Sequence, residues 1–550
     1  MLVAPPPPPA IIPPDVMAQS CGCQQGKPMS WKPEIDEIHH RRALAEQCGG
    51  AQAVAKHHAA GKLTIRERIH ALLDADSFQE IGKLAGTAGY DQNGSLTAFT
   101  PAPYVAGIGK IDGRAVAIGG EDYTIRGGAG YGGQRRKGGQ GGFIEDLACQ
   151  YRIPLVNLID GVGGSVASIS RRGHATFPGS GQDGFERSVE LMGIVPVVSA
   201  VMGTAAGGPS GRAILAHWTV MVKHTSQIFA AGPPVVERAF GAKVTKDELG
   251  GHQMAVDTAG TIDNAAESEQ DCLRQIQRFL SYLPSNVWEL PPRALCSDPV
   301  DRCEPSLADI VPRSQRQPYN MRKLIEMVVD KDSVFEIQPT FGRAVITSLA
   351  RMNGIVVGVI AFNPMFGGIV DAKAARKQTH FTELCDTFHI PLVFLVDVPG
   401  FQIGMEAEAS GILRVGMQGR YLNMQLSVPV YTVVVRKCYG MAGGSTIDRS
   451  GLNFKIAWPS AEWGSLPIEG GVKAAFRREI EAAADPAQKE AEIEAEIRRS
   501  TSPFLTAEAF GVEDLIDPRE TRPYLCRFLE AAVIGMRTRV GPRLRGGVRP

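Results

Sequence analysis

Two glycine-rich stretches of the sequence have the residue types and spacing to bind a negatively charged oxygen. Residues 203–208 follow the mostly apolar run 194–202, and residues 440–444 follow the apolar run 428–435, each ahead of a segment with helical character. Such a turn has little side chain and leaves backbone N–H groups free to donate to a developing oxyanion. For one copy, glycine's dihedral freedom would be sufficient explanation. Two copies at matching places favour a paired anion-stabilising device.

The two stretches belong to a longer internal repeat. Counting in equal steps from Pro196 and Pro429 aligns residues 207–208 with residues 440–441. The other shared landmarks are the pattern D-x-D-S-x-x-E-I at 74–81 and 330–337, a hairpin-like turn at 111–116 and 352–357, and a segment ending in aspartate at 147–160 and 384–397. Four landmarks in one order indicate a duplicated domain, and each copy is far longer than a solenoid repeat.

The organisation of the chain follows from this repeat. Within each half, buried strands alternate with helices, which predicts α/β layers with the helices outside. The segment 291–318 is rich in proline and charge and has no period, so the domain boundary is expected there. The expected divisions are a disordered proline-rich arm at 1–30, domains at 31–300 and 301–535, and a basic tail at 536–550.

Composition excludes several classes of function. The 550 residues include 58 basic and 58 acidic side chains, so no net charge attracts nucleic acid or an acidic membrane surface. No apolar run is long enough to span a bilayer. The N-terminus does not resemble a secretory signal, and the ten cysteines form no CxxC pair. We therefore expect a cytoplasmic protein without a metal site.

Common catalytic motifs are absent or out of context. Residues 128–133 satisfy G-x-G-x-x-G, but no helix is expected before about residue 142, so a loop is favoured over a dinucleotide site. The sequence has no GxSxG, HExxH or Walker A motif. The histidine pairs at 39–40 and 57–58 are expected on helix surfaces, because adjacent helical residues diverge around the axis.

Two aspartates stand at matching strand ends. Asp160 and Asp397 each precede a turn rich in glycine or proline. Strand-end loops commonly build binding sites in α/β proteins. Turn chemistry explains the same residues, so both interpretations stay open at this point.

Six stretches together resemble a known family. They are residues 61–68, 203–208, 362–364, 397–401, 436–440 and 457–462. They resemble the carboxyltransferase (β) subunit of biotin-dependent acyl-CoA carboxylases, of the propionyl-CoA and methylcrotonoyl-CoA type. The resemblance covers about residues 32–528.

The resemblance implies a fold, an activity and partners. The fold would be a pair of duplicated crotonase-like (ββα spiral) domains, assembled as a homo-hexamer in which the N-domain of one subunit faces the C-domain of another. The activity would be transfer of CO2 from carboxybiotin to the α- or vinylogous carbon of a coenzyme A thioester. No Met-Lys-Met biotinylation site is present, so the biotin is expected on a partner that carries the biotin carboxylase and the carrier domain.

The resemblance also implies site residues. Backbone N–H groups of Gly207 and Gly208 would hold the thioester oxygen, and those of Met441 and Ala442 would hold the biotin ureido oxygen. Further binding residues would be Tyr439, Gly440 and Gly443 on the biotin side, and Ala206, Gly163 and Gly164 on the acyl-CoA side. The cofactor would supply the base, so the protein has mainly to stabilise oxyanions.

The sequence departs from the propionyl-type pattern at both turns. Residues 442–445 stand where those relatives have a tyrosine and an aspartate after the second turn, so the acidic residue that shapes their short-chain selectivity is missing. Pro209 removes one N–H donor after the first turn. The acyl group therefore stays open. A decarboxylase or transcarboxylase subunit, or a non-catalytic scaffold, remains an alternative.

Overall fold

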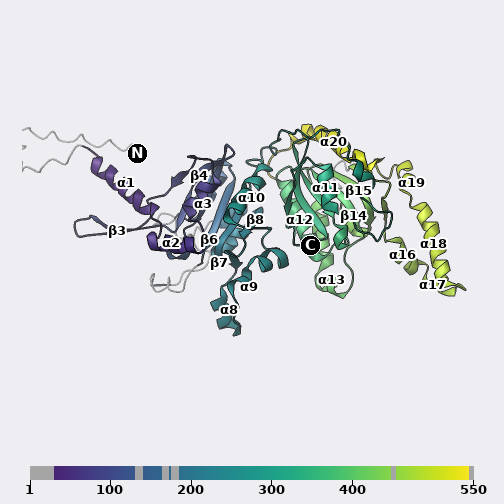
Figure 1. Cartoon of the computed structure of the whole chain (residues 1–550), viewed down its shortest axis with the longest axis horizontal. Helices are drawn as coiled ribbons and strands as arrows, with labels where there is room; N and C mark the ends of the chain where they lie inside the picture. The colour runs from purple at the N-terminus through teal and green to yellow at the C-terminus, as the bar shows by residue number, and fades with distance from the viewer. Residues whose placement is uncertain (1–29, 130–139, 164–172, 175–184, 447–453, 544–550) are drawn as a thin grey trace, which may run out of the picture.

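The computed structural model describes residues 30–129, 140–163, 173–174, 185–446 and 454–543. Within these residues, each half of the chain forms one eight-stranded mixed sheet flanked by helices (Figure 1). The predicted arm at 1–30, except its last residue, and the end of the predicted tail lie outside the described residues, as does most of the G-x-G-x-x-G loop. No helix in the described part of the chain is long and apolar enough to cross a membrane.

The first sheet has the strand order β1-β4-β5-β6-β7-β8-β10, with β9 paired to β7. Its strands are β1 (Gln79–Ile81), β4 (Tyr104–Ile111), β5 (Arg114–Glu121), β6 (Leu155–Gly161), β7 (Val197–Ala206), β8 (Trp218–Val222), β9 (Gln227–Phe229) and β10 (Asn264–Ala266), and a separate hairpin is formed by β2 (Gly86–Tyr90) and β3 (Leu96–Pro101). The helices are α1 (Lys32–Glu46), α2 (Ala51–Ala59), α3 (Ile65–Leu72), α4 (Phe143–Tyr151), α6 (Phe185–Leu191), α7 (Gly208–Ile214), α8 (Pro233–Phe240), α9 (Lys246–Gly250) and α10 (Glu269–Ser281).

The second sheet has the corresponding order β11-β12-β13-β14-β15-β16-β18, with β17 paired to β15. Its strands are β11 (Phe335–Ile337), β12 (Val345–Met352), β13 (Ile355–Phe362), β14 (Leu392–Val398), β15 (Val430–Tyr439), β16 (Phe454–Ala457), β17 (Glu462–Gly464) and β18 (Asp514–Leu515). The helices are α11 (Met321–Val328), α12 (Ala372–Thr387), α13 (Met405–Ala409), α14 (Ile412–Asn423), α15 (Gly440–Gly444), α16 (Ile468–Ala475), α17 (Arg477–Ala482), α18 (Pro486–Ser500), α19 (Pro503–Glu508) and α20 (Thr521–Met536).

The two halves are equivalent down to strand register. In each sheet the first two pairings are antiparallel and the remaining pairings are parallel. Leu155 pairs with Val197 in the first sheet, and Leu392 pairs with Val430 in the second. Both of these strand pairs then shift register just before the strand ends. The predicted duplication is confirmed, and it takes the form of two crotonase-like α/β domains.

The repeated D-x-D-S motif ties each hairpin to the preceding helix. The carboxylate of Asp74 accepts the N–H groups of Asp112 (3.0 Å) and Gly113 (2.8 Å), at the turn between β4 and β5. Asp330 accepts the equivalent N–H groups at the turn between β12 and β13, at 2.9 and 2.8 Å. The shared sequence pattern therefore encodes a shared hydrogen-bonding role.

One hydrophobic core joins the two halves. The buried ring of Trp218 stacks on Phe279 of α10 with ring centroids 4.9 Å apart, and meets Phe335 of the second half edge-on at 5.5 Å. Asn264 accepts the indole N–H of Trp218 and donates to the carbonyl oxygen of Glu336. The two sheets therefore pack through α10 and α12, which lie between them in Figure 1.

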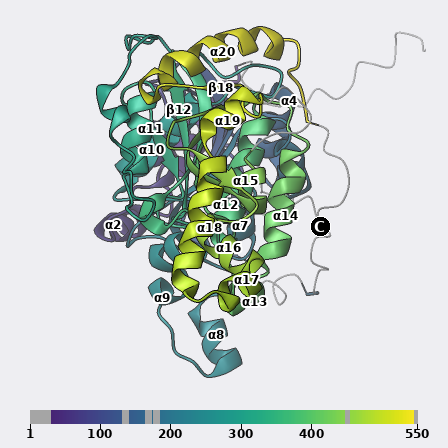
Figure 2. The ribbon, with the colours of Figure 1, turned by 90° about the vertical axis from the view of Figure 1, so that its right-hand side faces the viewer.

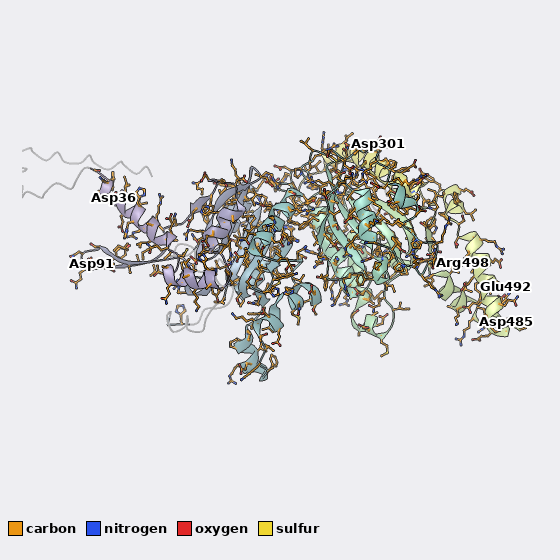
Figure 3. All side chains as sticks on the ribbon, in the orientation of Figure 1. Asp36, Asp91, Asp301, Asp485, Glu492 and Arg498 are labelled. Carbon is orange, nitrogen blue, oxygen red and sulfur yellow. The ribbon has the colours of Figure 1, made fainter. Side chains whose placement is uncertain are left out.

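Helices α16 to α19 form an outer layer at the far end of the second half (Figure 3). Asp485, labelled there, is the N-cap of α18 and accepts the N–H of Gln488 at 3.0 Å. A small apolar cluster that includes Ile480 and Ile493 holds α17 and α18 together. This layer packs mostly on itself.

We expect the loss of the Asp330 carboxylate to destabilise the protein more than the loss of Asp74, its counterpart in the first half. Burial alone would raise the pKa of Asp330, but N–H donation from Gly354 and the Arg522 guanidinium outweigh it and lower the pKa. Arg522 is itself fully buried. Asp330→Ala would remove the 2.7 Å carboxylate partner of this cation and leave only the Asp298 carboxylate, at 3.7 Å. The substitution should therefore cost up to about 3–5 kcal/mol of unfolding free energy.

Asp74→Ala is the matched control, because Asp74 makes the same turn contacts and no arginine in the described part of the chain pairs with it. Its cost should be about 1–3 kcal/mol. The quantity to compare is the urea midpoint of the two variants. The extra contribution of Asp330 should be present above about pH 4, the ordinary carboxyl pKa, and should disappear as the pH falls through its lowered pKa. Equal midpoints at neutral pH would contradict this account.

Candidate functional site

The two glycine turns occupy equivalent positions at the ends of the central strands. β7 and β15 each have ten residues, and Gly207 and Gly440 are the first residues after them. Gly207 has φ 67° and Gly440 has φ 60°, a backbone conformation that side-chain-bearing residues avoid. The alignment of residues 207–208 with 440–441 is therefore confirmed, and glycine is required at the first position of each turn.

The amides of both turns are available to a ligand. Among the described residues, no hydrogen-bond acceptor is found for the N–H groups of Gly207, Gly208, Met441 or Ala442. Gly207 and Gly208 are exposed, and Met441 is 47% exposed. Ala442 is buried and lines a small cavity behind the second turn. Each turn thus has a pair of N–H donors without an acceptor among the described residues.

The remaining predicted residues differ in what they do locally. A Cβ on Gly163 would lie 3.0 Å from the carbonyl oxygen of Ala206 and 3.5 Å from the nitrogen of Gly208, so this loop packs against the first turn. Gly164 lies outside the described residues. Tyr439 is buried, and a Cβ on Gly443 would lie 2.9 Å from the carbonyl carbon of Cys438. In the second half, these two residues therefore shape the backbone of the turn.

Asp160 lies at the centre of a buried ionic cluster beneath the first turn. Its carboxylate accepts from Arg68 at 3.1 Å and from Lys62 at 3.3 Å. A Cβ at Gly203 would lie 1.9 Å from the Asp160 carboxylate, so the carboxylate rests directly on β7. Arg68 also forms a two-point contact with Glu269, at 2.6 and 3.1 Å. The cluster therefore joins α3, α10 and the ends of β6 and β7.

His57 belongs to the same cluster. Its Nε2 lies 4.0 Å from the Asp160 carboxylate, and the residue is 7% exposed. Burial lowers the pKa of His57, although the Asp160 charge opposes this. The predicted surface position is wrong for His57, whereas residues 39–40 and 58 are exposed. His57 lies on the face of α2 that is directed toward the Asp160 cluster, so its side chain points inward.

A second buried pair anchors the helix that follows the first turn. Arg212 of α7 pairs with Glu121 at the end of β5. The other carboxylate oxygen of Glu121 accepts the N–H of Asp160 at 3.3 Å. The last turn of α7 is thus connected through Glu121 to the cluster beneath the glycine turn.

The second half uses a related device. The carboxylate of Asp397 pairs with Arg436 at 2.9 Å and accepts the N–H of Lys437 at 3.2 Å. Arg436 lies within β15, four residues before Gly440, and also donates to the carbonyl oxygen of Gln317 at 2.9 Å. Asp160 and Asp397 are both almost completely buried, so both are positioning groups beneath the turns and neither is open to a ligand.

The arrangement suits stabilisation of oxygen anions by main-chain donors. Sequence reasoning found the turns but missed Arg68, Glu269, Glu121 and Arg212. Arg68 stands inside the 61–68 stretch, where spacing gave no indication of its partners. The immediate neighbours of Gly207 and Gly440 come from their own halves, Gly163 and Ser465 respectively.

Comparisons with known proteins identify the family. The model of the carboxyl transferase domain matches residues 56–546. The chain is 34% identical to the propionyl-CoA carboxylase carboxyltransferase subunit of Haloferax mediterranei, over 90% of this chain and 95% of that protein. It is 32% identical to the methylmalonyl-CoA decarboxylase subunit alpha of Veillonella parvula, over 94% of this chain and 98% of that protein.

Among solved structures, the chain resembles the transcarboxylase 12S hexamer core with methylmalonyl-coenzyme A bound, with a TM-score of 0.83 and 32% identity over 95% of this chain and 98% of that one. The fold, the twin turns and these matches agree. The chain belongs to the carboxyl transferase domain family, as a carboxyltransferase subunit of the biotin-dependent acyl-CoA carboxylase type.

Proposed function

We propose that the two turns are the two oxyanion holes of the carboxyl transfer. The amides of Gly207 and Gly208 hold the thioester oxygen of an acyl-CoA, and those of Met441 and Ala442 hold the ureido oxygen of biotin. The observation that carries the proposal is the pair of equivalent turns, each with two donors that lack an acceptor among the described residues. Donors fixed in advance act on charge as it develops and require no reorganisation during the reaction.

The second turn fits the ureido group of biotin. A neutral urea oxygen accepts two N–H donors, and the glycines on either side of Met441 and Ala442 keep bulky side chains away. Biotin, carried on a partner subunit with biotin carboxylase activity, supplies the carboxyl group and the base that takes the α-proton. The α-carbon of the acyl group thus loses a proton and gains CO2, while the Gly207 and Gly208 amides stabilise the enolate oxygen.

A second copy of the chain completes the site. The two turns belong to different halves, and the atoms nearest each turn come from its own half. A head-to-tail arrangement brings the first turn of one subunit to the second turn of another. The hexamer assembly of the transcarboxylase 12S core supports such an arrangement.

Replacing Gly208 tests the first oxyanion hole. A Cβ at Gly208 meets nothing within 4 Å, so Gly208→Val should fold normally while its side chain covers the amides. Loss of one such donor costs about 3–4 kcal/mol of barrier, so kcat should fall at least 100-fold. The measurement is carboxylation by the complex reconstituted with its partner.

Gly470→Val is the matched control, because Gly470 is also helical and free of neighbours within 4 Å. It should leave kcat within twofold of wild type. Both variants should keep the wild-type melting temperature to within a few degrees. Normal carboxylation by Gly208→Val would refute the role of the first turn.

A decarboxylase or transcarboxylase reaction is the second candidate, favoured by the Veillonella parvula and transcarboxylase 12S relatives. The same two turns would serve carboxylation, decarboxylation and transcarboxylation. With the partner, ATP and labelled bicarbonate, a carboxylase should transfer label to acyl-CoA, and omission of ATP should abolish the transfer. ATP-independent loss of CO2 from a carboxylated acyl-CoA would instead identify a decarboxylase. Turnover of either kind would exclude a scaffold without catalysis.

A further inference from the structure

Arg420 of α14 lies against the backbone of the second turn. Its Nη1 donates to the carbonyl oxygen of Gly444 at 2.7 Å. A Cβ built on Gly444 would lie 3.5 Å from the same nitrogen. Any side chain at position 444 would therefore point at the Arg420 guanidinium, and glycine places no side chain there.

The guanidinium has no counter-charge in the described part of the chain. Among those residues no carboxylate pairs with Arg420, and its one hydrogen bond goes to a neutral carbonyl. By contrast, Arg68 and Arg436, the arginines beneath the two turns, both pair with buried aspartates. A guanidinium carries five N–H donors, and most of those on Arg420 have no acceptor among the described residues. Arg420 is half-buried, which makes an anionic partner worth more than it would be in open water.

Arg420 also lines a cavity together with one of the proposed donor residues. Arg420 and Ala442, whose amide is one of the proposed donors, line the same small cavity, together with Phe401 and Thr379. No carboxylate of the described residues lines this cavity, and its volume is about 20 Å³, room for about one water-sized group. The cavity can therefore receive the end of a polar group, while a longer chain would have to lie outside over Gly444. In Figure 2, α12, α14 and α15 appear together around this point.

We propose that Arg420 selects acyl-CoA substrates whose acyl chain ends in a carboxylate. The inference rests on the proposed function, because the acyl group reaches this turn from the first turn of a second copy. With glycine at position 444, the Arg420 guanidinium brings a positive charge next to the backbone of this turn.

Two other roles for Arg420 make different predictions. A guanidinium that held the carboxyl group on biotin would serve every acyl-CoA equally. A guanidinium that only capped the C-terminal carbonyl groups of α15 would contribute to stability and not to discrimination. A pair of thioesters with equal chain length, one with and one without a terminal carboxylate, separates these roles from substrate selection.

The test compares glutaryl-CoA with pentanoyl-CoA, and succinyl-CoA with butyryl-CoA, on the full complex. Wild type should prefer the carboxylate-bearing member of at least one pair. Arg420→Leu should lower kcat/KM for that thioester about 10- to 100-fold, mainly through KM, and leave its neutral partner unchanged or improved. Arg420→Lys should retain part of the preference. Arg414→Leu removes an exposed cation from the same helix and should change neither value.

Calorimetric binding of the same four thioesters gives a readout that does not need turnover. Preferential binding that Arg420→Leu abolishes would support the inference even if the reaction class were different. The inference would be overturned if Arg420→Leu lowered kcat/KM or affinity equally for both members of a pair. It would also be overturned by a fall in melting temperature without a change in preference, or by a wild type without any preference. Turnover of neutral thioesters with no preference would leave the proposed function intact and refute this inference alone.

Discussion

The site depends on one constraint. Each central strand must end in a sharp turn whose amides have no acceptor among the described residues, and the strand end must be held rigidly. Glycine at positive φ provides the abrupt turn at Gly207 and Gly440. The base is provided by buried ion pairs at the strand ends, Asp160 with Arg68 and Asp397 with Arg436. Breaking such a pair leaves an uncompensated buried charge, so the strand ends cannot easily shift. Unpaired donors stabilise charge only when they are already in place.

Duplication explains why the molecule has two such turns, one in each half. Each half has the same strand order, the same hairpin tied by an aspartate, and the same register shift before the turn. The shared core around Trp218 keeps the halves in a fixed relation. In the proposed assembly, two chains then provide a hole for the substrate from one half and a hole for the cofactor from the other.

The two halves have diverged in the charged groups around their turns. Beneath the first turn, Asp160 has Arg68, Lys62 and His57 around it. Beneath the second turn, Asp397 is held by Arg436 and backbone groups. The further cation at the second turn, Arg420, is not part of this foundation: it donates to the carbonyl oxygen of Gly444 and pairs with no carboxylate of the described residues. In the proposal above, this charge determines which acyl groups are accepted.

The sequence by itself determined the duplication, the alternation of strands and helices, and the two turns. These features are local: the patterns at 74–81 and 330–337, the apolar runs and the glycines can be read along the chain. The tertiary structure alone decided the partners of the charged residues. Arg68 meets Asp160 and Glu269 across 92 and 201 residues, and His57 is buried although its helix pattern indicated a surface position. Periodicity reports which face of an element is apolar, whereas the pairing of buried charges depends on which distant strands and helices pack together.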